Sequence, residues 1–226
     1  MSLRAGYYFT ALSLYLLFPS HNNGVEQPIT TQIDIVSVTQ YEAYDTLFVA
    51  QENGWLGSDA AHSIVLAEDR ILWLFGDTFI GTVEGERRYP EGPHINNCIA
   101  IEDRSDSSPG DIRYYWGTKD DKPYAFFPPD PDMPGLYFWP TSGLVVKDRL
   151  LLFSFAMSAN DTTWWLDGTV VAVIENYTES PEQWQTKYYD LKLGDNGFGI
   201  HSALYLEGDF IYFVGFNDFE GGRSAI

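Results

Sequence analysis

Two carboxylates, Asp59 and Asp77, lie at the outer ends of a predicted β-hairpin. Residues 57–66 and 70–79 contain short apolar runs rich in Ile, Val, Leu and aromatic residues, joined by a tight polar turn at residues 67–69. Such runs are typical of strands buried on both faces. Antiparallel pairing would bring Asp59 and Asp77 to the same end of the hairpin. Clustered carboxylates acquire separated pKa values, so one can act as a base while the other stays protonated.

The hairpin recurs along the chain. Ser63, Ser142 and Ser202 each lie in an apolar run that is followed by a polar turn and a second apolar run. The first two units add a third and a fourth predicted strand: Cys98–Asp103 and Ile112–Trp116 in the first, and Val171–Asn176 and Trp184–Tyr189 in the second. Four antiparallel strands per repeat predict an all-β chain built from the blades of a β-propeller.

The repeat predicts the organisation of the chain. We expect a signal peptide at residues 1–24 and a partial propeller at 25–226, with blade 1 at about 57–117, blade 2 at about 136–191 and the start of blade 3 at about 198–218. Residues 220–226 show no closing strand. A propeller needs about four or more blades to close its ring, so we expect the chain to be truncated.

The first unit differs from the others at the two acidic positions. Where it has Asp59 the other units have Phe138 and Phe198, and where it has Asp77 they have Ala156 and Phe216. A carboxylate among apolar residues is costly unless it is paired or hydrogen-bonded, which favours a functional role for both acids. The structural alternative is that each Asp accepts backbone N–H groups in a turn, as Asp77-Thr78 after Gly76 could do.

The charge restricts the classes of partner. The formal net charge of −19 disfavours nucleic acid and anionic membrane surfaces, because both would be repelled. Carbohydrate is the natural neutral candidate, and we expect a monomer without a cofactor.

The N-terminal run Ala5–Phe18 predicts export. It is too short to cross a bilayer as a helix, but it matches the apolar core of a signal peptide, with a short buried helix as the alternative. We therefore expect a secreted or periplasmic protein. Cys98 is the only cysteine, which excludes an intramolecular disulfide and favours a buried structural thiol.

These motifs resemble a known family. The runs 57–59, 74–79 and 95–97, followed by Trp139-Pro140, are similar to bacterial five-bladed β-propellers described as domains of unknown function, some of whose relatives are endo-D-arabinanases. The wider resemblance is to five-bladed glycosidases of the arabinanase, xylosidase and fructosidase type. It covers roughly residues 44–218 and implies five blades in the full-length protein, of which about two and a half are present here.

The resemblance implies glycoside hydrolysis of an arabinan-like polysaccharide. Asp59 and Asp77 would face a central funnel as acid/base or nucleophile candidates. A third acid would come from a later blade, for which Asp218 and Glu220 are candidates. The rival hypotheses are a non-catalytic propeller that binds glycans or another surface, and an inactive fragment.

Four further residues are candidates for substrate binding: His62, Asn96, Trp139 and His201. His62 and His201 share one repeat position, which favours a structural role over substrate contact. Residues placed there, near the propeller axis, could also hold an ion or an ordered water molecule. Asn96-Asn97 could bind sugar hydroxyls or close a turn. Trp139, Trp164 and Trp165 could stack on sugar rings, although packing between blades is the favoured explanation for any one of them. No spacing resembles a zinc signature, so no metal ligand is assigned.

Overall fold

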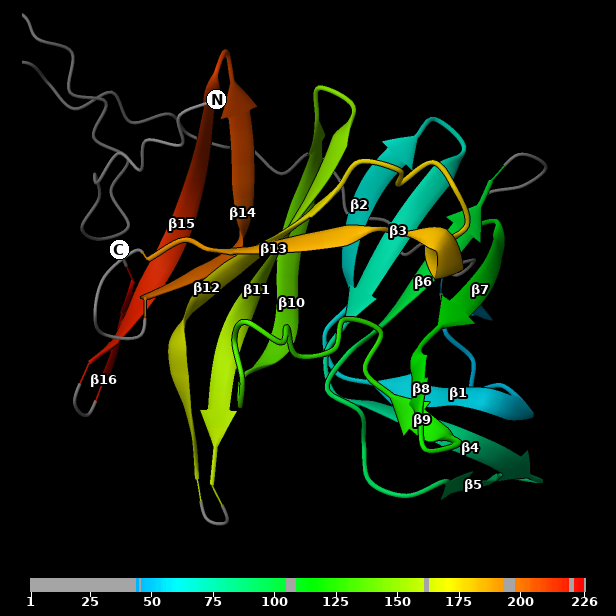
Figure 1. Cartoon of the computed structure of the whole chain (residues 1–226). Coiled ribbons are helices and arrows are strands. Elements are labelled where there is room, and N and C mark those ends of the chain that lie inside the picture. The colour runs from blue at the N-terminus through cyan, green and yellow to red at the C-terminus, as the bar shows by residue number, and fades with distance from the viewer. Residues whose placement is uncertain are drawn as a thin grey trace, which may run out of the picture.

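The protein is described by a computed structural model covering residues 44, 46–104, 109–160, 163–192, 198–219 and 222–225 (Figure 1). The expected signal peptide, residues 1–24, lies outside the described residues. Apart from short turns such as η2 (Pro181–Gln183), the regular structure of the described residues is β, which confirms the all-β prediction. No helix in this part of the chain is long and apolar enough to span a bilayer.

Two antiparallel sheets have four strands each, in chain order, and a third has three. The first contains β2 (His62–Ala67), β3 (Arg70–Phe75), β6 (Cys98–Asp103) and β7 (Asp111–Tyr115). The second contains β10 (Tyr137–Val146), β11 (Arg149–Ala159), β12 (Trp164–Ile174) and β13 (Thr186–Asp190). The third contains β14 (Phe198–Glu207), β15 (Phe210–Phe219) and β16 (Gly222–Ala225). The predicted third and fourth strands are confirmed, but the expected absence of a strand at 220–226 is wrong, because β16 pairs with β15.

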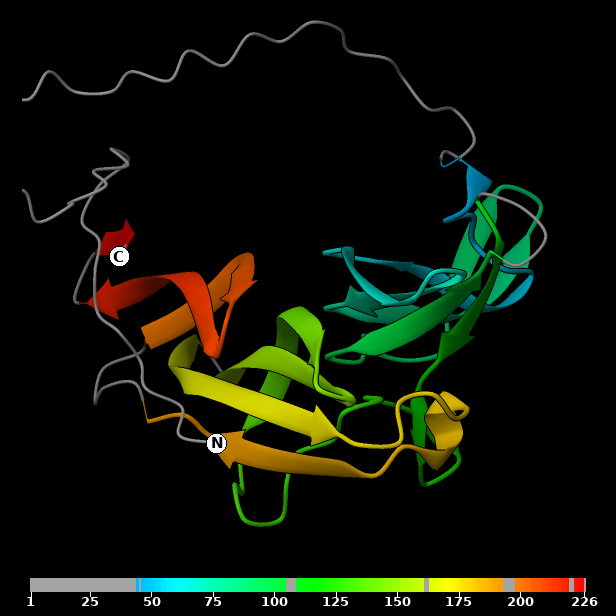
Figure 2. The same ribbon diagram turned by 90° about the horizontal axis from the view of Figure 1, so that it is seen from above.

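The three sheets follow one another along an arc (Figure 2). Strand β10, the first of the second sheet, contacts both β2 and β14, the first strands of the neighbouring sheets. A large apolar cluster lies between the first and second sheets, and its fully buried members include Leu72, Leu74, Ile99, Leu150 and Ile174. Burial of this apolar surface holds the two sheets in a fixed relation.

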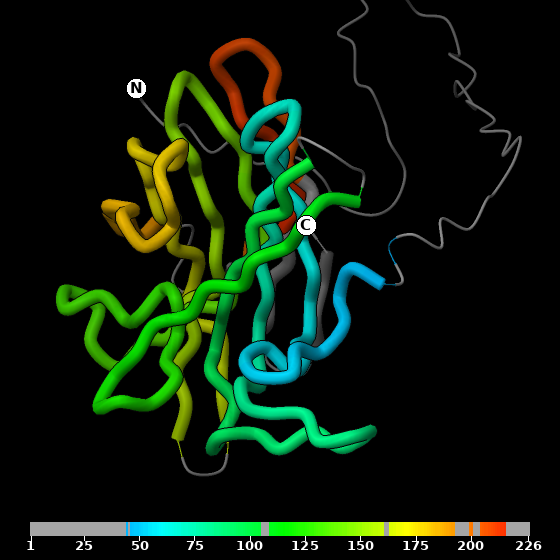
Figure 3. Tube along the Cα trace, turned by 90° about the vertical axis from the view of Figure 1, so that its right-hand side faces the viewer, coloured from blue at the N-terminus to red at the C-terminus, as the bar shows by residue number. Residues whose placement is uncertain are grey.

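A small sheet crosses the end of the β2–β3 hairpin (Figures 1 and 3). It contains β1 (Asn53–Ser58), β4 (Thr78–Glu84) and β5 (Arg87–Pro90). The prediction of two continuous strands at 57–66 and 70–79 is therefore wrong in part, since each run is divided between two sheets. A further hairpin, β8 (Gly117–Lys119) and β9 (Lys122–Tyr124), lies between β7 and β10 in the chain.

Strand β2 is buried on one face only. Ile64 and Leu66 point into the core, whereas Val65 between them is 64% exposed. The prediction that this run is buried on both faces is wrong. The strand alternates between a covered and an uncovered face, as a strand with one packed side does.

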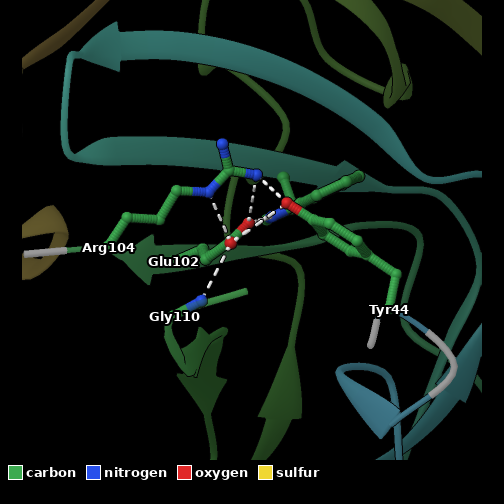
Figure 4. A network of polar contacts seen from close by, with 5 residues as sticks. Tyr44, Glu102, Arg104 and Gly110 are labelled. Atoms are coloured by element: carbon green, nitrogen blue, oxygen red, sulfur yellow. Dashed lines mark hydrogen bonds and ion pairs between the residues drawn. The ribbon is translucent and has the colours of Figure 1, made fainter. Parts of the chain in front are cut away.

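A buried carboxylate fixes the far end of the first sheet. Glu102 in β6 is fully buried and accepts hydrogen bonds from Trp73 Nε1 at 2.9 Å and from the Gly110 N–H at 3.1 Å (Figure 4). The Arg104 guanidinium pairs with the same carboxylate at 2.6 Å and donates to the Tyr44 hydroxyl. The carboxylate therefore has several partners that compensate for its burial, and it serves the fold rather than the site.

Candidate functional site

Asp59 and Asp77 lie side by side where the hairpin bends from one sheet into the other. Strand β1 pairs with β4 and β2 with β3, so the two connections that contain these acids face each other. The N–H of Asp59 donates to the carbonyl of Asp77 at 3.0 Å, and the N–H of Gly76 donates to the carbonyl of Asp59 at 3.1 Å. The predicted proximity of the two acids therefore holds, although each lies between strands rather than within one.

Gly76 leaves room for the Asp59 side chain. A Cβ atom at this position would collide with Oδ1 of Asp59. The next residue but one, Thr78, is fully buried and its hydroxyl donates to the Gly76 carbonyl at 2.8 Å. The glycine and this hydrogen bond hold the bend in a shape that accommodates the carboxylate of Asp59.

His94 approaches Asp77 from a loop. Thr78 and Ile95 exchange two backbone hydrogen bonds of 2.8 Å each, which tie this loop to the start of β4. His94 Nε2 consequently lies 3.5 Å from Oδ2 of Asp77, and the His94 ring makes an edge contact with Phe79. His94 was not predicted from the sequence as a catalytic or substrate-binding residue.

Trp139 contacts Asp77 from the second sheet. Its indole Nε1, on β10, donates a hydrogen bond of 3.0 Å to Oδ1 of Asp77. The two carboxylate oxygens of Asp77 thus have different neighbours, Trp139 at one and His94 at the other. Trp139 was predicted to bind substrate, and the structure brings it to the acid pair as a direct partner of Asp77.

The surroundings of Asp77 favour its protonated form. Burial raises the pKa of Asp77, and the negative charge of Asp59 raises it further, while His94 and the Trp139 hydrogen bond lower it. The balance is a pKa above the ordinary value of 3.8. Burial also raises the pKa of Tyr137, to which the charge of Asp77 adds. A raised pKa in a cleft is a recurrent property of groups that transfer protons.

Both acids line one cavity of about 510 Å³. Its lining comes from the bend, from β4 and β5 and from the His94 loop: Leu56, Gly57, Ser58, Asp59, Asp77, Phe79, Arg88, Pro90 and His94. The Oγ of Ser58 is buried and has no hydrogen-bond partner among the described residues. The cavity therefore combines two carboxylates, one guanidinium, one imidazole and apolar walls, a composition typical of small-molecule sites.

The adjacent amides Asn96 and Asn97 differ in environment. Asn97 is fully buried, donates to the carbonyls of Phe127 and Phe138 at 3.1 and 2.9 Å, and accepts from the Phe127 N–H at 2.8 Å. These three hydrogen bonds anchor the loop before β10 to the first sheet. Asn96 is half-buried and is absent from the described lining of the cavity. Asn97 therefore has a structural role, but it joins segments far apart in the sequence rather than closing a turn as predicted. Substrate binding by Asn96 stays a prediction.

The other predicted residues are not among the described lining residues of the cavity. His62 starts β2 on the same face as Ile64 and is half-buried. His201 lies in β14, but its side chain is outside the described residues, as are the side chain of Asp218 and the whole of Glu220. Among the described residues, no group of three His, Cys, Asp or Glu side chains is placed to hold a metal ion.

The second sheet provides a comparison for the acidic bend. Phe138 and Ala156, which occupy the positions of Asp59 and Asp77 in the repeat, are cross-strand partners and are 1% and 3% exposed. The repeat alignment therefore corresponds to equivalent places in the two sheets. One sheet fills these places with core side chains, and the other puts carboxylates against a cavity.

A second cavity of about 430 Å³ lies between β7 and the segment from η2 to β13. Its lining includes Tyr115, Trp116 and Trp184, with Glu182 as the carboxylate among the described lining residues. It does not bring two acids together, so we place the candidate chemistry at the Asp59–Asp77 bend.

Comparison with known proteins supports the fold. A crystal structure of a protein from Bacteroides ovatus ATCC 8483, described as a "putative hydrolase", superimposes with a TM-score of 0.62 at 16% sequence identity. The similarity covers 90% of this chain but 59% of that one, so the chain spans less than two thirds of the length of its structural relative. No curated protein matches the chain. Residues 41–221 match the family described as "Domain of unknown function (DUF5005)", and the protein belongs to this family.

Proposed function

We propose that the protein is a glycoside hydrolase that cleaves an arabinan-like polysaccharide through carboxylate acid/base chemistry at Asp59 and Asp77. The observation that carries the proposal is the raised pKa of Asp77 beside a second carboxylate on a shared cavity of about 510 Å³. Glycosidases hydrolyse their substrates with such a pair of acids. The sequence resemblance to propeller glycosidases and the description of the structural relative as a hydrolase support the same reaction class.

In this mechanism Asp77 is the general acid. Its raised pKa keeps a larger fraction of the carboxyl protonated than an ordinary Asp would, and its proton goes to the glycosidic oxygen as the bond to the sugar breaks. Asp59 is the anionic partner, acting either on a water molecule or directly on the sugar. Both routes pass through a transition state with oxocarbenium character, which the negative charge of Asp59 stabilises.

Trp139 and His94 are the positioning residues of this mechanism. Each contacts a different oxygen of Asp77, at 3.0 and 3.5 Å, and together they restrict the rotation of the carboxyl group. A fixed carboxyl orientation aims the proton of Asp77 at the glycosidic oxygen. Such positioning of reacting groups makes a large contribution to the rate. Both residues also lower the pKa of Asp77 and so limit its rise.

We further propose that the sheets are successive blades of a secreted or periplasmic β-propeller, five-bladed in the full-length protein. Two observations support this assignment. Four antiparallel strands follow one another in chain order within a sheet, and β10 contacts both β2 and β14 of the neighbouring sheets. The apolar run Ala5–Phe18 supports export.

The test is hydrolysis of arabinan, inulin and xylan by the full-length gene product, with Asp59→Asn and Asp77→Asn alongside. Both variants keep the size and planar shape of the side chain but remove its acidic group, and circular dichroism checks that they fold. We expect cleavage of at least one polysaccharide by the wild type and a loss of about 100-fold or more in each variant. Glycan binding without cleavage by the wild type would instead favour the non-catalytic glycan-binding propeller.

A further inference from the structure

Aromatic side chains from the second sheet continue the site beyond Asp77. Trp139, whose indole donates to Asp77, makes a T-shaped contact with Trp164 at a ring-centroid distance of 5.3 Å. Tyr137 also makes a T-shaped contact with Trp139, at a ring-centroid distance of 5.7 Å. Tyr137 and Trp139 are on β10 and Trp164 begins β12, so these rings gather at one end of the second sheet. An aromatic wall therefore starts at the acid pair and leads away from the first sheet.

Trp164 is the exposed end of this wall. Its side chain is 48% exposed, whereas Trp139 is half-buried and its N–H is already used by Asp77. A large aromatic ring at an exposed edge gains little stability from packing, and its open surface remains available to a ligand. The apolar C–H surface of a sugar ring is complementary to such a surface.

The cavity beside the acids is lined by a different set of residues. Arg88 and Pro90 from the β4–β5 hairpin line the cavity together with Asp59 and Asp77. Trp164 is not among these lining residues and is connected to the acids through Trp139. The cavity, built on the small sheet of β1, β4 and β5, and the aromatic wall, built on the second sheet, therefore meet at Asp77.

We propose that Trp164 is a stacking platform for one saccharide unit of a polymeric glycan, while the neighbouring unit occupies the cavity. This inference rests on the proposed function and deepens it, because it specifies a chain of at least two sugar units that crosses the acid pair. Substrate units on both sides of the acids place the cleaved bond within an oligosaccharide. Trp164 contributes affinity and register along the glycan, and the proton transfer remains with Asp77.

Trp165 provides a matched control. It follows Trp164 directly, has the same residue type and is 43% exposed. Successive side chains of a strand point to opposite faces, and the pairing of these residues with Ala159 and Ser158 is regular. Trp165 therefore lies on the opposite face of the strand from Trp164. Replacing Trp165 removes a similar exposed aromatic surface but leaves the aromatic wall unchanged.

The experiment measures the affinity of linear arabinan, inulin and xylan by isothermal titration calorimetry. Trp164→Ala and Trp165→Ala are compared in the full-length gene product carrying Asp77→Asn, which prevents turnover. We expect the Trp164→Ala change to weaken binding of the preferred glycan about tenfold and the Trp165→Ala change to leave it within about twofold. In the Asp77-containing enzyme, Trp164→Ala should raise KM far more than it lowers kcat.

The outcomes separate the platform from the proposed function. Unchanged affinity in the Trp164→Ala variant, or an equal loss in Trp165→Ala, would overturn the platform while leaving hydrolysis by the acids intact. A tenfold loss specific to Trp164→Ala with no hydrolysis by the wild type would support the platform as a binding site and overturn the hydrolase. No binding of any of the three glycans by the wild type would overturn both.

Discussion

The indole Nε1 of Trp139 donates a 3.0 Å hydrogen bond to Oδ1 of Asp77 and joins the second sheet to the acidic bend of the first. Asp77 is 62 residues away from Trp139 in the sequence, and the bond exists because β10 packs beside β2. The orientation of the candidate acid therefore depends on how two sheets are packed, as well as on the bend that holds both carboxylates.

Trp139→Phe should slow hydrolysis and move its pH dependence. The Trp139 hydrogen bond lowers the pKa of Asp77, so its loss raises that pKa further. Because a general acid works while protonated, the decline of kcat/KM at high pH should shift to higher pH. The looser carboxyl group should also reduce kcat about tenfold. The measurement is a pH–rate profile, with Trp165→Phe as the control; an unshifted profile would contradict the assignment of Asp77.

Gly76→Ala should disturb the chemistry more than the fold. The added Cβ displaces the Asp59 carboxylate, whose Oδ1 occupies that space. We expect kcat to fall about tenfold or more, because a small misplacement of a reacting group has a large effect on rate. Gly168→Ala is the matched control, since a Cβ there meets no heavy atom within 4 Å. Full activity in Gly76→Ala would argue against a role for the present position of Asp59.

Asn97→Ala should destabilise the protein by about 2–4 kcal/mol, because three buried hydrogen bonds to Phe127 and Phe138 are lost. Asn96→Ala, at the half-buried neighbour, should change the free energy of unfolding by less than about 1 kcal/mol. Urea denaturation of both variants measures the difference. Equal stability of the two variants would contradict the conclusion that Asn97 anchors the loop before β10 to the first sheet.

Asp77→Asn should stabilise the protein increasingly as the pH rises. Below the ordinary Asp pKa of 3.8, Asp77 is protonated in both the folded and the unfolded protein. Above it the unfolded side chain ionises first, because burial raises the pKa of Asp77 in the folded state, and the folded state loses stability until that higher pKa is passed. Asn has no such penalty. Urea unfolding over a pH series should therefore show a widening advantage of the variant, and a constant difference would contradict the raised pKa.

The acid pair could be predicted from the sequence, but its surroundings could not. Asp59 and Asp77 stand at mirrored positions of a hairpin, and the apolar residues Phe138 and Ala156 at the equivalent places mark the acids as exceptional. The bend itself was missed. Ala60 adopts a left-handed φ of 51°, which the preceding residues Gly57, Ser58 and Asp59 do not reveal in the sequence.

Contacts between distant segments explain the other omissions. His94 reaches Asp77 through the Thr78–Ile95 bridge, which no local pattern encodes. The exposed face of β2 was missed for a related reason, since an apolar Val65 in a run of apolar residues does not indicate which side is covered. For Asn97 the sequence left open sugar binding and the closing of a turn, and its bonds to Phe127 and Phe138, 30 and 41 residues away, belong to neither hypothesis.

The most direct test of the account compares two substrates with two variants. Asp77→Asn and Asp59→Asn are assayed on arabinan and on a 2,4-dinitrophenyl arabinofuranoside, whose leaving group departs without protonation. We expect both variants to lose about 100-fold or more in kcat/KM on arabinan, and only Asp77→Asn to regain most of its activity on the aryl glycoside. Wild-type activity of either variant on arabinan, or recovery in Asp59→Asn instead, would contradict the assignment of Asp77 as the acid and Asp59 as its partner.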